Sequence, residues 1–340
     1  MKRLLPDTFT CLLLCAVVLA SFLPISGQPA EWFSLATNIA IALLFFLHGA
    51  RLSTDTVIAG FLHWRLQLFI LVTTFVVFPL LGLGLSLLSP WLIEQPIYLG
   101  LLFLCILPST VQSSIAFTSM AGGNVPAAIC AASTSNILGI FLTPALVALL
   151  FTTSGHVGMS FDMVWKIMLQ LFLPFVAGQV LQPFIGNWIR SKKSLLNPFD
   201  RGSILMVVYL AFSQAVVEGI WQRFEIGDLA LLVAVDCLLL ATVLLITSLG
   251  SKLVGFNRED RIAAVFCGSK KSLASGVPMA SVIFAGQSIG AIVLPLMLFH
   301  QIQLMVCAWL ARTYALQQKT AAPVVDTMQP EPASSGAGRA

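Results

Sequence analysis

The sequence predicts an all-α polytopic membrane protein with ten transmembrane helices, and two observations support this prediction. Hydrophobic residues make up 58% of the 340 residues and charged residues only 9%, whereas soluble globular chains are about 45–50% apolar and about 25% charged. So few charges cannot cover a water-exposed surface, so lipid must be the solvent. The apolar residues also gather in runs of about 20 residues, the length with which a helix crosses about 30 Å of hydrocarbon.

Each apolar segment is expected to be a helix, because a helix satisfies its own backbone hydrogen bonds in lipid. A closed barrel would need shorter, alternating segments. The first segment also fits a secretory signal peptide, with Lys2 and Arg3 ahead of the apolar stretch, but Asp7 and the missing Ala-x-Ala site favour a retained helix. The ten segments are residues 8–25, 32–50, 66–88, 97–120, 125–151, 163–185, 203–220, 229–250, 261–285 and 289–311.

The distribution of basic residues predicts the orientation of the chain. With the N-terminus inside, most of the lysines and arginines fall on the cytoplasmic side, as the positive-inside rule requires. Both termini are therefore expected in the cytoplasm, and the compact chain suits a bacterial inner membrane. Residues 317–340, rich in Pro, Ala, Ser and Gly, predict a disordered cytoplasmic tail. The net charge of +4 is too small to indicate a nucleic-acid partner.

Ten helices divide into two five-helix repeats, residues 1–151 and 152–316, which must enter the membrane from opposite sides. Sequence similarity between these halves is faint. The fourth segment of each half, however, carries a polar interruption with Gly or Pro. These interruptions span residues 107–114, around Pro108, and residues 267–278.

Corresponding interruptions in two inverted halves indicate the binding site of a secondary transporter. Backbone groups freed at membrane depth need a polar cavity or a protein partner. The alternative is that the Ser and Thr hydroxyls bond to their own helix and that Pro108 is a simple kink. The expected substrate or ion contacts are Ser109, Thr110, Gln112, Ser113, Ser114, Ser269, Lys270, Lys271, Ser272 and Ser275, and the expected structural breaks are Pro108, Gly268, Gly276 and Pro278.

Other polar residues inside the segments have two interpretations each. His300 and Gln303 lie three residues apart on one helix face, where they would line the cavity or bond one helix to another. Asp236 would pair with a lysine or bond to nearby backbone. The seven cysteines lie in apolar runs without a Cys-x-x-Cys pair, which is typical of buried structural thiols. No metal site or cofactor is expected.

Enzyme motifs are missing from the sequence. It has no His-Glu-x-x-His, no Gly-x-Ser-x-Gly and no phosphate-binding Gly-x-x-x-x-Gly-Lys-Ser/Thr run. Without an ATP-binding motif, uphill movement of a substrate would depend on an ion or substrate gradient.

Two segments resemble a known family. Residues 105–124 are similar to the fourth-helix signature of the bile acid:sodium symporter superfamily, and residues 266–279 resemble the sodium/bile acid cotransporter 7-like branch. Residues 294–303 add a third match, and the resemblance extends over about residues 5–314. It implies ten helices in two inverted repeats, a core and a panel domain, and broken fourth and ninth helices that cross near the membrane centre.

The same resemblance implies that the usual sodium ligands are replaced. The family's Ser-Asn pair reads Ser113-Ser114 here, and its Ser and Thr on the fifth helix are Ala128 and Ala132. Its Gln on the third helix corresponds to Thr74, and its Glu at the ninth-helix break corresponds to Ser269. Sodium binding at these positions is therefore not expected.

Lys270 and Lys271 follow directly after the replaced Glu. A charge at membrane depth costs at least about 2.5–3.5 kcal/mol, so such residues are functional candidates. An ammonium group would replace sodium as a fixed cation whose proton provides coupling, or it would bind an anionic substrate. The third possibility is that the side chains extend to the cytoplasmic surface, although both lie roughly 15 Å along the helix.

The sequence thus predicts an ion-coupled secondary active transporter of a small organic anion that works by alternating access, with no sodium expected at the family's usual positions. The alternative is a non-transporting membrane regulator of calcium homeostasis on a transporter fold, which the association of the cotransporter 7 branch with calcium implies. The expected partners are the lipid bilayer and the anionic substrate. The oligomeric state stays open.

Overall fold

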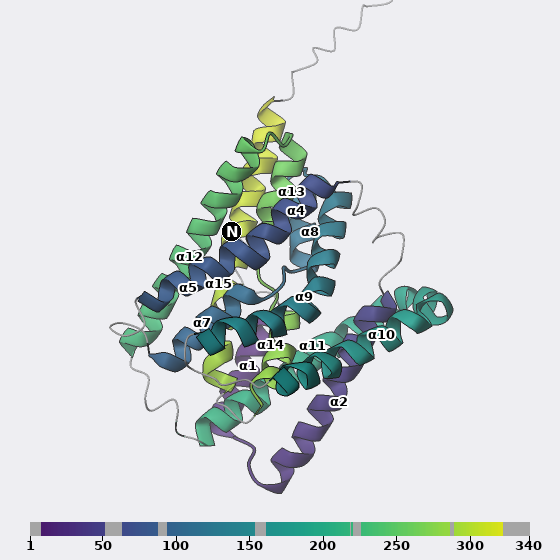
Figure 1. Ribbon diagram of the computed structural model, residues 1–340, viewed down its shortest axis with the longest axis vertical. Coiled ribbons are helices and arrows are strands. Elements are labelled where there is room, and N and C mark those ends of the chain that lie inside the picture. Colours follow the sequence, from purple (N-terminus) through teal and green to yellow (C-terminus); the bar gives the residue numbers. More distant parts are fainter. Residues whose placement is uncertain are drawn as a thin grey trace, which may run out of the picture.

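A computed structural model describes residues 8–51, 63–87, 94–153, 161–217, 219, 226–285 and 289–321, and within these ranges it contains helices and no strand (Figure 1). Lys2, Arg3 and Asp7, on which the signal-peptide alternative depends, lie outside the described residues. The elements are α1 (Thr8–Phe22), α2 (Gln28–Arg51), α4 (Trp64–Val72), the π-helical turn η1 (Thr73–Val77), α5 (Phe78–Gly84), η2 (Leu85–Leu87), α7 (Gln95–Ile106), α8 (Gln112–Met120), α9 (Val125–Thr153), α10 (Phe161–Ser191), α11 (Lys193–Val217), α12 (Ile226–Leu253), α13 (Arg258–Gly268), α14 (Leu273–Ile283) and α15 (Ile289–Ala321).

Seven helices of the described ranges are long and apolar enough to cross a membrane: Gln28–Arg51, Trp64–Leu87, Val125–Phe151, Leu169–Ile189, Pro198–Val217, Gly227–Leu253 and Ile289–Gln318. The other three predicted segments contain shorter helices. One holds the 15-residue α1, and the other two hold the pairs α7–α8 and α13–α14. The architecture is therefore that of a polytopic helical membrane protein, while ten spans in inverted repeats stay a prediction.

Large apolar side chains point outward from these helices. Trp32, Phe184 and Trp309 are 70%, 82% and 67% exposed, respectively. So much exposed apolar surface would be unfavourable in water but is what a lipid-facing surface requires.

Two groups of helices are visible in Figure 1. In the first group, α2 packs along α10, and α1 packs along α11. The α2–α10 crossing is close because a Cβ atom on Gly49 would meet the carbonyl oxygen of Phe175, and one on Gly178 would meet that of Phe46. Small residues at such crossings allow two membrane helices to approach backbone to backbone.

The second group contains α4–α5, α7, α8, α9 and α12–α15, and within it α7 packs against α5, α9 and α15 (Figure 1). Residues 101–107 of α7 and its end are completely buried. This matches the sequence, in which α7 is apolar on every face, because such a helix has no side for water. The chain therefore carries the interruption after α7 into the middle of the molecule.

The C-terminal part differs from the expectation. Helix α15 continues to Ala321, so residues 317–321 of the predicted disordered tail are helical. Residues 322–340 lie outside the described residues.

Candidate functional site

The chain is non-helical at residues 107–111, between α7 and α8, and again at residues 269–272, between α13 and α14. These two segments are in direct contact, because the backbone N–H of Ser272 donates to the carbonyl oxygen of Pro108 at 2.9 Å. Pro108 removes a helical donor at the first segment. Ser272 ends the second by capping α14, with its Oγ accepting from the backbone N–H of Ser275 at 3.2 Å.

Serine hydroxyls of the first segment satisfy carbonyl groups at the end of α13. The Oγ of Ser109 donates to the carbonyl oxygen of Cys267 at 2.5 Å. The Oγ of Ser114 donates to that of Phe266 at 3.0 Å. The last carbonyl groups of a helix have no partner within the helix, so these hydroxyls join the two interruptions.

Asn136 on α9 connects both segments from the side. Its Nδ2 donates to the carbonyl oxygen of Ser109 at 2.7 Å, and its Oδ1 accepts from the Oγ of Ser275 at 2.7 Å. Asn136 is not among the site residues predicted from the sequence. The available signal was an amide side chain in the middle of an apolar helix, where polar groups are costly unless they are hydrogen-bonded.

Lys271 is completely buried and its ammonium group is fully hydrogen-bonded. Its Nζ donates to the backbone carbonyl oxygens of Thr74, Cys105 and Leu107, at 2.9, 2.8 and 2.7 Å. The same Nζ lies 4.0 Å from the centre of the Phe78 ring, within cation–π range. Three carbonyl oxygens and one aromatic face thus surround the charge; we call this arrangement the carbonyl cradle.

Local sequence explains why these carbonyl oxygens are free. In the π-turn η1, the backbone N–H of Phe78 reaches the carbonyl of Thr73. In the same register the carbonyl of Thr74 would face residue 79, which is Pro79 and has no N–H to donate. The other two carbonyls of the cradle lie at the end of α7, where no further helical turn supplies a donor. The carbonyl of Ile106, between them, is satisfied by the Thr143 hydroxyl at 3.0 Å.

Lys270 has different surroundings from its neighbour, although it is also completely buried. Its Nζ lies 3.9 Å from the centre of the Phe117 ring and 5.8 Å from that of Phe266. Within the described part of the chain this Nζ has no hydrogen-bond acceptor. The two lysines therefore occupy separate environments, one made of carbonyl oxygens and one made of aromatic rings.

Gln303 holds the Lys271 segment against α15. Its Oε1 accepts from the backbone N–H of Lys271 and its Nε2 donates to the carbonyl oxygen of Lys271, both at 2.9 Å. The Nε2 also lies 2.9 Å from Nδ1 of His300. Because the Lys271 N–H fixes which end of the amide is the oxygen, Nδ1 of His300 must accept this hydrogen bond.

A cavity of about 610 Å³ opens beside the two interruptions. Polar side chains from both of them reach it, as do residues of α2, α9, α11 and α15. Apolar residues such as Phe45, Phe175 and Met279 form the rest of the wall. The polar lining consists of His48, Arg51, Thr110, Gln112, Ser113, Ser133, Asn136, Asp200, Arg201, Ser272, Ser275 and His300.

The α2 and α11 side of this cavity is cationic. Arg51 forms an ion pair with Asp200, and the Arg201 guanidinium lies 5.4 Å from the centre of the Phe9 ring. This side of the cavity therefore contains two guanidinium groups and one carboxylate, which gives it a net positive charge. The sequence analysis placed both arginines on the cytoplasmic side of the membrane. It did not place them in the cavity, because only the packing of α2 against α11 brings them together.

The predicted site residues divide into two sets. Thr110, Gln112, Ser113, Ser272, Ser275 and His300 line the cavity. The remaining ones are not part of the cavity lining. One contact between the two sets is made by Thr110, whose Oγ1 is 2.8 Å from Ser113 Oγ in the lining and 2.9 Å from Ser114 Oγ outside it. This second set is Thr74, Ser109, Ser114, Ser269, Lys270, Lys271 and Gln303, each of them buried.

Three of the four residues that were expected to break the helices lie within helices instead. Gly268 is the last residue of α13, and Gly276 and Pro278 lie inside α14. Gly276 serves close packing, because a Cβ atom there would overlap the side chains of Leu107 and Leu296. Only Pro108 lies within a non-helical segment.

The sequence left Asp236 either paired with a lysine or bonded to nearby backbone, and neither interaction is found among the described residues. Asp236 is completely buried on α12, and neither carboxylate oxygen has a hydrogen-bond partner among the described residues. The ion pair found within those residues is that of Arg51 with Asp200.

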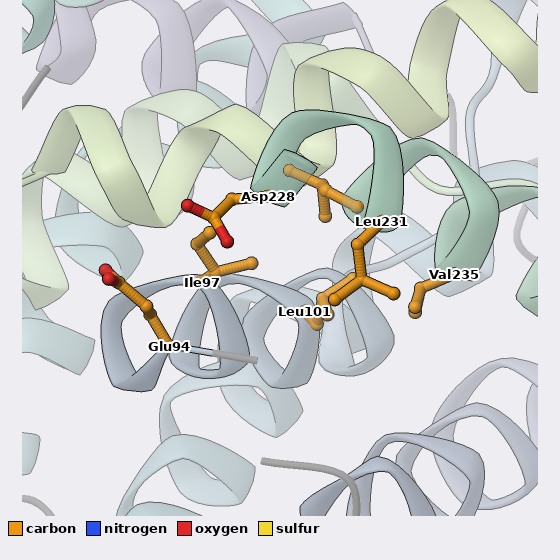
Figure 2. Close-up of a pocket in the computed structure, with 7 residues that line it drawn as sticks. Glu94, Ile97, Leu101, Asp228, Leu231 and Val235 are labelled. Carbon is orange, nitrogen blue, oxygen red and sulfur yellow. The ribbon is translucent and has the colours of Figure 1, made fainter. Parts of the chain in front are cut away.

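A second, smaller hollow lies between the first turns of α7 and α12, and Figure 2 shows two carboxylates at its edge. Glu94 and Asp228 stand at the starts of these helices, where the helix dipole favours negative charge. Apolar residues, including Ile97, Leu101 and Val235, form the rest of the hollow. No group of three metal-type ligands occurs anywhere in the described ranges.

The residues at the sodium positions do not fit a sodium ion. Ala128 and Ala132 are buried and offer no side-chain oxygen. The Ser113 and Ser114 hydroxyls are engaged with Thr110. Ser269 stands at the position of the family's Glu, and Lys270 and Lys271 follow it directly.

The long apolar helices define a polytopic membrane protein. The chain belongs to the SBF-like CPA transporter family, whose model matches residues 7–316. It is therefore an integral membrane protein of a family of transporters, not of enzymes.

Known relatives cover almost the whole chain. A Pseudomonas aeruginosa protein described as uncharacterized is 57% identical over 321 residues, which are 94% of this chain and 96% of the relative. "Putative symporter YfeH" of Escherichia coli is 53% identical over 311 residues, 92% of this chain and 93% of the relative. "Sodium/bile acid cotransporter 7" of Rattus norvegicus is 29% identical over 292 residues, 85% and 86% of the two chains.

Proposed function

We propose that this protein is a secondary active transporter that moves a small organic anion across the bacterial inner membrane by alternating access. The observation that supports this most directly is the cavity of about 610 Å³, onto which both helix interruptions open. The volume is within the range of pockets that hold small molecules, about 300–1,000 Å³.

The charges around the cavity support an anionic substrate. Arg51 and Arg201 outnumber Asp200 on one side. On the other side the first turns of α8 and α14 reach the cavity, and the N-terminal end of a helix carries partial positive charge. Polar side chains of the lining such as Gln112 and Ser133 would supply hydrogen bonds, and the aromatic and aliphatic walls suit the organic part of the substrate.

Alternating access would use the two groups of helices. Residues from α1, α2, α10 and α11 line one side of the cavity, and residues from α8, α9, α14 and α15 line the other. Rocking of the first group, the panel, against the second, the core, would open the cavity to each side of the membrane in turn. In this proposal residues 1–151 and 152–316 are the two inverted repeats and both termini lie in the cytoplasm.

The energy source would be an ion or substrate gradient without sodium at the family's usual positions. The engaged serines and the two buried alanines support this part of the proposal. The substrate and the lipid bilayer are the proposed partners.

Uptake into proteoliposomes tests the proposal. The purified full chain would be offered radiolabelled acetate, benzoate or taurocholate under a sodium gradient, a proton gradient, a gradient of unlabelled anion, or none. We expect uptake of at least one anion, several-fold slower in Arg201→Gln, because that variant removes a cavity charge. Arg312→Gln, which changes an exposed arginine of α15, is the matched control and should transport normally.

No flux of any of these anions under any gradient would contradict the proposal. It would favour the alternative function, a non-transporting regulator of calcium homeostasis. Equal flux in both arginine variants would contradict the assignment of the cavity as the anion pathway.

A further inference from the structure

We infer that Lys271 is a tethered cation that permanently fills a monovalent-cation site, and that truncating its side chain opens this site to a free alkylammonium ion. The inference rests on the proposed function only in placing the carbonyl cradle in the moving core of a transporter. It concerns the cradle itself, and its test measures stability rather than transport.

The geometry of the cradle is that of a cation site. The carbonyl oxygens of Thr74, Cys105 and Leu107 come from two separate helices and converge on one nitrogen at 2.7–2.9 Å. Backbone carbonyl oxygens arranged in this way replace the hydration shell of a cation in membrane proteins. An ammonium group has three N–H donors, so each donor has one acceptor and the Phe78 ring faces the same charge.

The electrostatics of the end of α7 also favour a cation in the carbonyl cradle. The carbonyls of Cys105 and Leu107 belong to the end of α7, and the C-terminal end of a helix carries partial negative charge. Pro79 leaves the carbonyl of Thr74 without a helical donor. Three buried acceptors would thus be unsatisfied if no donor reached them, which is costly in an apolar interior.

The backbone that carries the charge is held in place as well. Gln303 binds both the N–H and the carbonyl oxygen of Lys271, and the next residue, Ser272, donates its N–H to Pro108. A free ion would leave and return during a transport cycle. A lysine held in this way keeps the cradle satisfied in every state of the core without an ion from solution.

Lys270 provides a matched comparison within the same segment. It has the same side chain and is equally buried. Its Nζ lies against aromatic rings and has no carbonyl acceptor in the described part of the chain. Truncating Lys270 therefore removes a buried charge without opening a carbonyl site.

Thermal unfolding with added alkylammonium tests the inference. Wild type, Lys271→Ala and Lys270→Ala would be extracted as full-length fluorescent fusions, heated, and assayed by size-exclusion chromatography in methylammonium chloride or in tetramethylammonium chloride. Both ions carry one charge, but only methylammonium has N–H donors. We expect methylammonium to raise the melting temperature of Lys271→Ala by about 5 °C relative to tetramethylammonium, with no difference for the other two proteins.

Equal melting temperatures of Lys271→Ala in the two salts would overturn the inference, as would an equal rise in Lys270→Ala. If Lys271→Ala gives no monodisperse peak in either salt, the methionine variants decide. Methionine nearly matches lysine in size but cannot donate hydrogen bonds, so Lys271→Met must melt several degrees below Lys270→Met. Equal melting of these two would overturn the inference. None of these outcomes alters the uptake experiment, so failure of the cradle and failure of the transport proposal are distinguishable.

Discussion

The side-chain amide of Gln303 pairs with both backbone polar groups of Lys271, each at 2.9 Å. Gln303 is completely buried, and Lys271 lies in the non-helical stretch between α13 and α14. One amide on α15 thus takes the place of a neighbouring helical turn and sets the position of the Lys271 ammonium in the carbonyl cradle.

Replacing Gln303 by leucine should lower the stability of the protein markedly. The buried N–H and carbonyl of Lys271 would both lose their partner, and each unsatisfied group costs about 1–3 kcal/mol. We expect a melting temperature several degrees below that of wild type in detergent. Gln317→Leu, on an exposed turn of the same helix, is the control and should melt as wild type does. Unchanged melting of Gln303→Leu would show that the amide contributes nothing.

Sodium should not stabilise the wild-type protein. Two of the family's sodium positions are the alanines Ala128 and Ala132, the hydroxyls of Ser113 and Ser114 lie within hydrogen-bond distance of Thr110, and the carbonyl cradle is filled by Lys271. We expect melting temperatures within about 1 °C in sodium chloride and in choline chloride at the same ionic strength. A reproducible rise of several degrees in sodium alone would show that a sodium site exists elsewhere in the protein.

Asn136→Leu should weaken both stability and anion binding. The amide joins the carbonyl of Ser109 to the hydroxyl of Ser275 across the two interruptions, and it also lines the cavity. We expect a loss of about 1–3 kcal/mol in the free energy of unfolding from two lost, partly buried hydrogen bonds. Ser133→Ala, which changes a cavity residue on the same helix, should have little effect on melting. Similar melting of the two variants would remove Asn136 from the framework of the site.

Asp200→Asn should bind anions more tightly than wild type. The substitution removes the single carboxylate that offsets Arg51 and Arg201 in the cavity. From Coulomb's law in a partly solvated site we expect a roughly threefold to tenfold lower Kd for whichever anion binds, measured by ligand-dependent melting. The gain should shrink at high ionic strength because salt screens the charges. Weaker binding at all salt concentrations would mean that the carboxylate itself contacts the ligand.

Much of the site could be predicted from the sequence, because the polar segments stand out within long apolar runs. Apolar runs of membrane length make Pro108 and the Ser-Lys-Lys-Ser segment conspicuous, and the structure brings these two segments together through the bond of Ser272 to Pro108. His300 and Gln303 were recognised on one helix face, with both of their interpretations open. The structure assigns one to each: His300 lines the cavity, whereas Gln303 holds the Lys271 backbone.

Other parts of the site could not be predicted, because they depend on contacts between distant segments. Arg51 and Arg201 are ordinary cytoplasmic arginines in the sequence, and only the packing of α2 with α11 makes them cavity residues. Gly276 looked like a weak point in the helix but is a packing contact for Leu107. Thr74 takes part through its backbone carbonyl, which no side-chain pattern reveals.

The sequence by itself determined that this is a helical membrane protein whose polar residues gather in two segments. Composition and the length of apolar runs are local properties of the chain, so no tertiary structure is needed to recognise them. The tertiary structure alone decided what each of the two adjacent lysines does. The two lysines are adjacent and have the same side chain. The register of η1, the end of α7 and the amide of Gln303 place three carbonyl oxygens around the ammonium group of Lys271, whereas that of Lys270 has no acceptor among the described residues. A charge in a low-dielectric interior is governed by its nearest dipoles, and only the fold places those.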